Sequence, residues 1–280
     1  MYKFTLSNGI KIPKIGFGTY KSVTSEDKDV ILKALQVGYK HFDTASFYDN
    51  EEILGESIEK SGIRRDELFL TSKVWKEEMG YDNTIKAVNK SLIKLKTNYL
   101  DLCLIHWPKA NINNEDWREL DKETWRALET LYNAGKVKAI GLSNFHPHHI
   151  MNLLESANVK PMVNQIEFHP GYMQKAVVDY CQGNDILVEA WSPIGRGRVF
   201  NEPLLKELAN KYNKSIPQIC IRFALQLNVL PLPKSSSKER MIENMSVFDF
   251  KIEIEDMYRL MCLPQIGWSG EHPDRPREMV

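Results

Sequence analysis

Residues 68–73 read Leu-Phe-Leu-Thr-Ser-Lys, a short apolar run that ends at a residue able to do chemistry. Four other runs of the chain end in the same way, at Asp43, at His106, at Ser143-Asn144 and at Gln165. Side chains at the carboxyl ends of consecutive parallel strands converge on one rim when the sheet closes into a barrel. We therefore expect Lys73 and these residues to share a site at that rim.

Helical patterns separate the runs. Ile85, Val88, Leu92 and Leu95 recur at the spacing of one helix face, behind an expected cap at Asp82 or Asn83. Similar patterns predict helices near residues 31–38, 51–60, 125–135, 148–156, 174–182, 203–212, 216–226 and 238–245. With the short run 15–17 counted as a strand, the chain holds eight strand–helix units. Strands that alternate with helices form a parallel sheet, and eight such units predict an α/β fold of the (β/α)8 TIM barrel type.

The two ends of the chain add to this barrel. Ser7-Asn8-Gly9 separates the apolar segments 4–6 and 10–12, and Asn-Gly between short strands predicts an N-terminal β-hairpin. Near the carboxyl end, helices 203–212 and 216–226 follow one another directly, so extra helices are expected there. Because no linker or low-complexity segment divides the sequence, we expect a single domain over residues 1–280.

The composition limits the partners of the protein. Lys+Arg and Asp+Glu balance at 37 each, so no overall field would recruit nucleic acid or an anionic membrane. No apolar segment approaches the ~20 residues that span a bilayer, and the N-terminus lacks the apolar core of a signal peptide. The cysteines are too scattered to suggest a disulfide framework or a thiolate metal site. A cytoplasmic protein without nucleic-acid or membrane partners is expected.

Several local motifs resemble the aldo-keto reductases, a family of NAD(P)H-dependent carbonyl reductases built on the (β/α)8 barrel. The motifs are Phe42-Asp43-Thr44-Ala45 followed by Tyr48, Thr71-Ser72-Lys73-Val74-Trp75, and Leu104-Ile105-His106-Trp107-Pro108. The likeness runs from residue 16 to residue 244 and is to the bacterial small-aldehyde or diketogluconate reductase branch. It implies a monomeric, NADP+-dependent type of alcohol dehydrogenase with a catalytic tetrad of Asp43, Tyr48, Lys73 and His106.

These four residue types suit the reduction of a carbonyl group, which needs a hydride at carbon and a proton at oxygen. A free tyrosine has a pKa near ~10 and is a poor acid at neutral pH. The ammonium of Lys73 favours the phenolate and is expected to lower the pKa of Tyr48. Asp43 would keep Lys73 charged, and His106 would donate a second hydrogen bond to the carbonyl oxygen. Tyr48 is thus predicted to be the general acid of reduction and the general base of alcohol oxidation.

A Rossmann-type dinucleotide site is excluded, because Gly16-Phe17-Gly18 and Gly195-Arg196-Gly197 both lack the third glycine of the fingerprint. The resemblance implies instead that Ser143, Asn144 and Gln165 bind the nicotinamide carboxamide and that Trp191 stacks on its ring. The loop Ser192, Pro193, Ile194 and Gly195 would follow the pyrophosphate, where backbone N–H groups can bind anions. Arg196 and Arg198 either assist this loop or are simply solvated. The implied cofactor contacts also include Gly18, Thr19 and Asp43.

The segment 233–240 runs into Glu243-Asn244 and resembles the part of the family that binds the adenosine 2′-phosphate. The residues implied for the phosphate are Lys234, Ser235, Ser236 and Arg240, with Glu243 and Asn244 near the adenine. Two cations and several hydroxyls at the start of a helix suit a dianionic phosphate. We therefore predict NADPH as the cofactor, with NADH the less favoured alternative.

The substrate pocket is expected to have aromatic walls, with candidates Tyr20, Phe47, Trp75, Trp107 and Trp268 and with the reacting carbonyl at Tyr48 and His106. An insert over residues 109–119 could shape one side. The tail 262–280 is short, rich in proline and charge, and matches the family poorly. The substrate is expected to be a small-molecule carbonyl compound. Small aldehydes, α-dicarbonyls such as methylglyoxal, ketoses, sugar aldehydes and a biosynthetic ketone all stay open.

His146-Pro147-His148-His149 suggests a zinc site at first sight. No carboxylate or cysteine accompanies it nearby, so we expect a solvated helix cap and no metal. Two other functions remain open for the chain. It could be an NADPH-binding redox sensor without turnover, against which the intact tetrad argues. It could also be a barrel aldolase or isomerase that forms a Schiff base at Lys73.

Overall fold

Eight parallel strands form a closed barrel in a computed structural model that describes residues 2–22, 29–110 and 115–275. The strands follow one another in chain order around the sheet, from β3 to β10. Gly16 N donates to Pro231 O and Gly18 N to Pro233 O, both at 3.1 Å, and these bonds join the first strand to the last. The predicted (β/α)8 barrel is confirmed. The strands are β3 Phe17–Gly18, β4 His41–Asp43, β5 Phe69–Val74, β6 Leu102–Ile105, β7 Ile140–Ser143, β8 Val163–Glu167, β9 Leu187–Trp191 and β10 Val229–Leu232.

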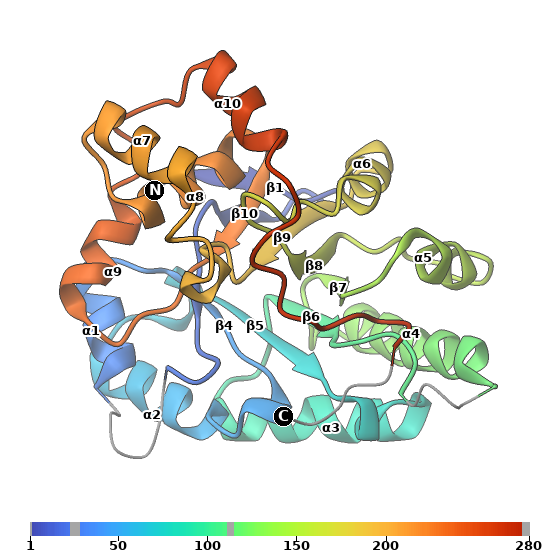
Figure 1. Ribbon diagram of the computed structural model, residues 1–280. Helices are drawn as coiled ribbons and strands as arrows, with labels where there is room; N and C mark the ends of the chain where they lie inside the picture. The colour runs from blue at the N-terminus through green and yellow to red at the C-terminus, as the bar shows by residue number, and fades with distance from the viewer. Residues whose placement is uncertain (1, 23–28, 111–114, 276–280) are drawn as a thin grey trace.

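Helices surround the strands on the outside of the barrel (Figure 1). Two of them, α7 and α8, lie between β9 and β10, as the sequence predicts. Within the described residues none is long and apolar enough to cross a membrane. The α-helices are α1 Val30–Val37, α2 Glu51–Ser61, α3 Tyr81–Lys94, α4 Trp117–Asn133, α5 Pro147–Leu154, α6 Lys175–Gly183, α7 Pro203–Tyr212, α8 Ile216–Gln226, α9 Lys238–Met245 and α10 Ile254–Met261; short 3-10 turns are η1 Ser46–Tyr48, η2 Arg65–Glu67, η3 Lys76–Glu78 and η4 Gly195–Gly197.

The N-terminal hairpin is present as predicted. Strands β1 Lys3–Thr5 and β2 Lys11–Pro13 pair antiparallel, and Gly9 takes a φ of +86° in the turn between them. The side-chain amide of Asn8 donates to the carbonyl of Lys138 at 3.0 Å, just before β7 begins. The hairpin therefore packs at the amino ends of the strands, away from the rim where the candidate catalytic residues lie.

Some helix boundaries differ from the prediction. Helix α3 begins at Tyr81 after Gly80, which has a φ of +96°, so the expected cap at Asp82 or Asn83 is wrong. Asp82 instead lies in the first turn, where its charge suits the helix dipole. Helix α4 begins at Trp117, inside the segment predicted as an insert, and residues 111–114 of that segment lie outside the described residues.

Gly55 in α2 shows how tightly the outer helices pack. A Cβ atom added there would lie 2.7 Å from the carbonyl oxygen of Lys94 and 2.8 Å from the carbonyl carbon of Leu95. These atoms belong to the backbone at the end of α3 and cannot rotate away. Gly183 at the end of α6 has no neighbouring atom within 4 Å of the same position.

Gly55→Ala should therefore lower the free energy of unfolding by about 1–3 kcal/mol, because the clash outweighs the better helix propensity of alanine. Gly183→Ala is the matched control and should be neutral or stabilising by up to about 1 kcal/mol. Urea unfolding followed by circular dichroism measures both. Equal effects of the two changes would contradict the packing described for Gly55.

Candidate active site

The four tetrad residues lie together at the carboxyl ends of three neighbouring strands. Asp43 is the last residue of β4, and Tyr48 ends η1, the turn that follows this strand. Lys73 lies near the end of β5, and His106 comes directly after β6. The parallel pairing of β4 with β5 and of β5 with β6 sets these positions side by side.

Lys73 forms the floor of the site and has all its donors satisfied. Its ammonium lies 2.6 Å from Asp43 Oδ1, and it donates to the carbonyl of Thr44 at 2.9 Å and to the hydroxyl of Tyr48 at 3.3 Å. On its other side the Tyr48 hydroxyl is 3.5 Å from His106 Nε2. The phenol oxygen thus lies between a cation and an imidazole, as the resemblance implied.

The charge on Lys73 is held by its neighbours. Burial disfavours the ammonium, but the attraction of Asp43 and the contact with Tyr48 outweigh burial, so the pKa of Lys73 is raised. Lys73 therefore stays charged at neutral pH.

The expectation of a lowered pKa for Tyr48 is wrong for this structure. Burial raises the pKa of the phenol, and Asp43 raises it further, while Lys73 lowers it in the direction expected. The pKa of Tyr48 is raised overall, because the loss of hydration on burial destabilises the phenolate by more than the nearby ammonium of Lys73 stabilises it. Tyr48 consequently carries its proton at neutral pH, which is the state that a proton donor needs.

Aromatic rings form a wall beside the tetrad. Phe47 stacks on Trp75 with ring centroids 3.9 Å apart, and Trp75 meets the His106 ring edge-on at 4.9 Å. Tyr20 packs against Tyr48 at 4.9 Å. Trp268 does not belong to this wall: it stacks on Tyr172 at 6.0 Å and is not among the residues that line the pocket, so its predicted role is wrong.

A pocket of about 720 Å³ opens above the tetrad and extends to the start of α9. This volume is ordinary for a small-molecule or cofactor site. Most of the predicted site residues line it, and they are Gly18, Tyr20, Asp43, Phe47, Tyr48, Trp75, His106, Trp107, Ser143, Asn144, Gln165, Trp191, Ser192, Pro193, Ile194, Arg196, Lys234, Ser235, Ser236, Arg240, Glu243 and Asn244.

Some predicted cofactor residues lie behind the pocket wall instead of in it. Thr19 is fully buried and donates through its backbone and hydroxyl to the carbonyl of Asp43, both at 3.0 Å. Gly195 is buried with a φ of +57° and shapes the loop after β9. Arg198 turns away, to the carbonyl of Gly267 at 2.7 Å and to Glu167 at 3.1 Å. These residues support the wall and do not form it.

Hydrogen bonds orient the side chains of the residues predicted to hold the nicotinamide. Trp191 donates its indole N–H to Asn144 Oδ1 at 2.8 Å, and Asn144 donates to the carbonyl of His106 at 2.9 Å. Asn144 has a φ of +64°, a conformation that asparagine tolerates better than most residues. A carbonyl oxygen has two lone pairs, so Asn144 Oδ1 can still accept from a ligand amide. A flat ring beside a preset amide acceptor fits a nicotinamide carboxamide.

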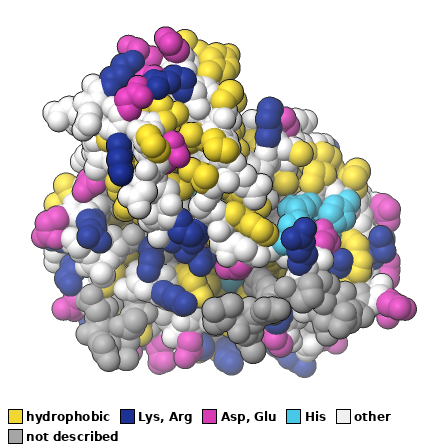
Figure 2. All heavy atoms as spheres, in the orientation of Figure 1, with side chains coloured by type: hydrophobic (Ala, Val, Ile, Leu, Met, Phe, Trp, Pro, Cys, Tyr) yellow, Lys and Arg dark blue, Asp and Glu magenta, His cyan; other side chains and the backbone are white. Residues whose placement is uncertain are grey.

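Positive charge gathers at the other end of the pocket. Burial lowers the pKa of Lys234, and the charges of Arg196 and Lys21 lower it further, so three cations lie near one another. Lys234 donates to the carbonyl of Lys21 at 3.2 Å. Basic side chains gather toward the middle of the face shown in Figure 2. Such an arrangement is favourable when an anion such as a phosphate lies between the cations.

Sequence reasoning missed part of the site. Lys21, Gly197, Phe200, Pro217, Leu232 and Glu271 also line the pocket, and Glu189 lies buried beneath it. Gln165 Nε2 donates to Asp43 Oδ2 and to Glu189 Oε2, both at 2.8 Å. The signal for Glu189 was present, because a carboxylate two residues before Trp191 in an apolar strand points to the same face as that tryptophan.

Glu189 has a measurable consequence for stability. Burial and the charge of Asp43 raise the pKa of Glu189 from its ordinary 4.5 to about 8. Between these values the unfolded chain loses a proton that the folded protein keeps, so this group makes folding less favourable as the pH rises.

Glu189→Gln removes this titration. As the pH rises from about 5 to about 8, the free energy of unfolding of the variant should increase relative to that of wild type, by at most about 1.4 kcal/mol per pH unit. Urea midpoints at several pH values measure the difference, and other buried acids cancel because both proteins contain them. A difference that does not change with pH would show that Glu189 is ionised in the folded protein.

Comparison with known proteins agrees with this geometry. A model of the Aldo/keto reductase family matches residues 14–262. Glyoxal reductase of Bacillus subtilis (strain 168) is 45% identical over 270 residues, covering 96% of this chain and 95% of that protein. The crystal structure of an aldo-keto reductase from a Medee basin deep-sea metagenome library has a TM-score of 0.91 and 39% identity, covering 98% of this chain and 100% of that chain. A Bombyx mori aldo-keto reductase crystallised in complex with NADP has a TM-score of 0.84 and 32% identity, covering 94% of this chain and 98% of that chain. The family match over nearly the whole chain and these similarities show that the protein belongs to the aldo/keto reductase family of oxidoreductases.

Proposed function

We propose that this protein uses NADPH to reduce small activated carbonyl compounds and that Tyr48 is the proton donor. One observation carries the proposal. The Tyr48 hydroxyl lies 3.3 Å from Lys73 Nζ and 3.5 Å from His106 Nε2, in a pocket that continues to a cluster of cations. A proton donor and an anion site in one pocket suit a phosphorylated reductant and a neutral carbonyl substrate.

Side chains of this protein donate the proton and stabilise the charges that develop during its transfer. When bound, the nicotinamide supplies the hydride for the carbonyl carbon. Tyr48 holds the proton for the carbonyl oxygen, and Lys73 stabilises the phenolate that remains after transfer. His106 can donate from Nε2 to the same oxygen as negative charge develops there. Trp75 and Phe47 stack on each other in the pocket wall at this end.

The cations at the far end favour NADPH over NADH. Lys234, Ser235, Ser236 and Arg240 lie together in the pocket wall at the start of α9. The 2′-phosphate of NADPH carries the charge that these groups are suited to bind, whereas the hydroxyl of NADH does not. Glu243 and Asn244 lie one turn further along α9, where they can contact the adenine.

The substrate proposal is a small α-dicarbonyl or aldehyde. The similarity to a protein named glyoxal reductase supports it, as do the aromatic rings beside the tetrad. We also propose that the protein forms one domain, as the undivided sequence predicts, that it works in the cytoplasm, and that it is a monomer, as the family resemblance implies. The alternative with a Schiff base at Lys73 has no support, because this ammonium is charged and uses its three donors.

Tyr48→Phe tests the proton donor. The change should lower kcat by about 10²- to 10⁴-fold, because the oxygen would then have no positioned acid. NADPH oxidation with methylglyoxal gives the rate, and quenching of protein fluorescence gives NADPH binding, which should be unchanged. Tyr20→Phe is the control and should stay active. Equal turnover by Tyr48→Phe and wild type would defeat the assignment of Tyr48 as the proton donor, and absence of turnover in both proteins would leave a cofactor-binding sensor as the better description.

Arg240→Ala tests the cofactor preference. The KM for NADPH should rise by about 10- to 100-fold through the loss of a charged hydrogen bond, while the KM for NADH should change little. Lys238→Ala is the matched control, since this lysine occupies the same turn of α9 but does not line the pocket. If Arg240→Ala changed the KM values for NADPH and NADH by the same factor, Arg240 would not bind the 2′-phosphate.

A further inference from the structure

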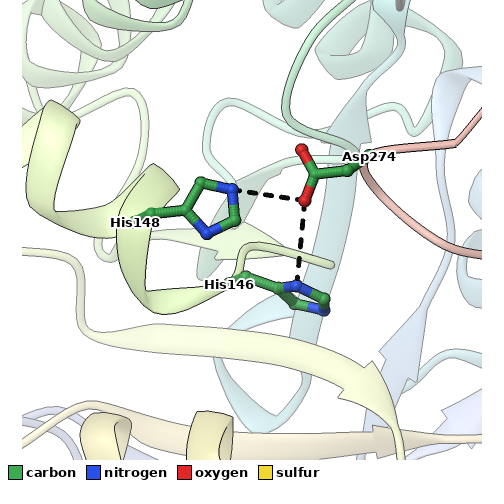
Figure 3. Close-up of side chains that lie close together, drawn as sticks. All are labelled: His146, His148 and Asp274. Carbon is green, nitrogen blue, oxygen red and sulfur yellow. Dashed lines mark ion pairs between the residues drawn. The ribbon is translucent and has the colours of Figure 1, made fainter.

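The histidines at the start of α5 have a carboxylate partner that sequence reasoning missed. The local sequence places no acidic residue next to His146-Pro147-His148-His149, but the fold brings Asp274 of the C-terminal tail against them (Figure 3). Asp274 Oδ2 lies 3.2 Å from His148 Nε2 and 4.0 Å from His146 Nδ1. The expectation of a solvated cap without a carboxylate is therefore wrong.

The spacing of these atoms suits one metal ion. The three atoms lie within 4.8 Å of one another. In a tetrahedral zinc site with bonds of about 2.0–2.2 Å, the ligand atoms are about 3.3 Å apart. The His148 side chain is 51% exposed, so it can rotate the remaining distance without disturbing the core. Two imidazoles and one carboxylate leave a fourth position for water.

The neighbours of the cluster orient its carboxylate and leave one oxygen available. His146 N donates to His149 Nδ1 at 3.1 Å, so the proton of His149 is on Nε2 and points to Asp274 Oδ1 at 3.0 Å. Lys109 Nζ contacts the same oxygen at 3.0 Å. Oδ2 is left facing His146 and His148. Outer contacts of this kind commonly fix the ligands of metal sites.

A further histidine of the C-terminal tail lies beside the cluster. The neighbouring ring of His272 lies 5.0 Å from that of His146, and its Nδ1 accepts the backbone N–H of Asp274 at 3.1 Å.

We propose that His146, His148 and Asp274 bind a divalent transition metal ion of the Zn²⁺ class, with water at the open position. Imidazole and carboxylate ligands in this number suit Zn²⁺ and Co²⁺ and do not suit Ca²⁺ or Mg²⁺, which prefer all-oxygen sites. None of the three ligands lines the pocket.

The ion would join two distant parts of the chain. After α10 the tail crosses the carboxyl-end face of the barrel toward α4 (Figure 1). Glu271 on this tail lines the pocket and pairs with Arg196 at 3.4 Å. Asp274 follows three residues later, so an ion bound there holds the tail to the start of α5. Metal binding would in this way restrain one wall of the pocket.

The test is metal binding by the full chain after treatment with a chelator. Calorimetry with Zn²⁺ and the visible absorption of bound Co²⁺ should show one site per chain. His148→Ala and Asp274→Asn should each weaken binding at least about tenfold. His148→Ala leaves the contacts of Asp274 with His149 and Lys109 in place, so its effect separates loss of a ligand from a loosened tail. Without metal, its melting temperature and NADPH-dependent activity should match those of wild type.

A second variant and a control sharpen the assignment. Lys109→Met removes a contact that orients the Asp274 carboxylate and should weaken Zn²⁺ binding severalfold. Cys262→Ser removes an exposed thiol elsewhere and should leave binding unchanged. No binding of Zn²⁺ or Co²⁺ by wild type at millimolar concentration would overturn the proposal. Binding that persists in both His148→Ala and Asp274→Asn, or that disappears in Cys262→Ser, would also overturn it.

Discussion

The buried ion pair between Lys73 and Asp43 is the interaction on which the rest of the site depends. The Lys73 side chain has no exposure to solvent, and a charge in such a place is tolerated only when its partners replace water. Asp43 and the carbonyl of Thr44 do so, and the remaining donor reaches Tyr48. The place of the phenol oxygen therefore follows from the place of the ammonium, which the pairing of β4 with β5 sets.

The same ion pair joins the catalytic residues to the residues predicted to hold the nicotinamide. Asp43 accepts from Gln165 on its second oxygen, and Gln165 also contacts Glu189. Asn144 links the backbone of His106 to the indole of Trp191. Strand ends thus supply a rigid floor, whereas the loop after β9 and the C-terminal tail supply the outer walls through contacts such as Arg196 with Glu271. The floor carries the groups proposed for proton transfer, whereas the outer walls are suited to select the ligand.

Much of this arrangement could be predicted from local sequence. Helices α7, α8 and α9 have the predicted bounds, because the apolar spacing that defines a helix acts within a few residues. The polar residues after the strand runs meet at one rim because a closed barrel brings the carboxyl ends of its parallel strands together. Other outcomes depended on distant groups. Trp268 packs on Tyr172 and not in the pocket, because the path of the tail places it there.

The sequence by itself determined the barrel, the order of its strands and the identity of the residues at their carboxyl ends, since a period of alternating strands and helices allows few other folds. Only the tertiary structure decided how deeply those residues are buried and which charges lie beside them. The pKa of Tyr48 rises although a lysine lies beside it, because the depth of burial belongs to the whole fold. Asp274 reaches the histidines of α5 in the same way, through chain folding that no local pattern records.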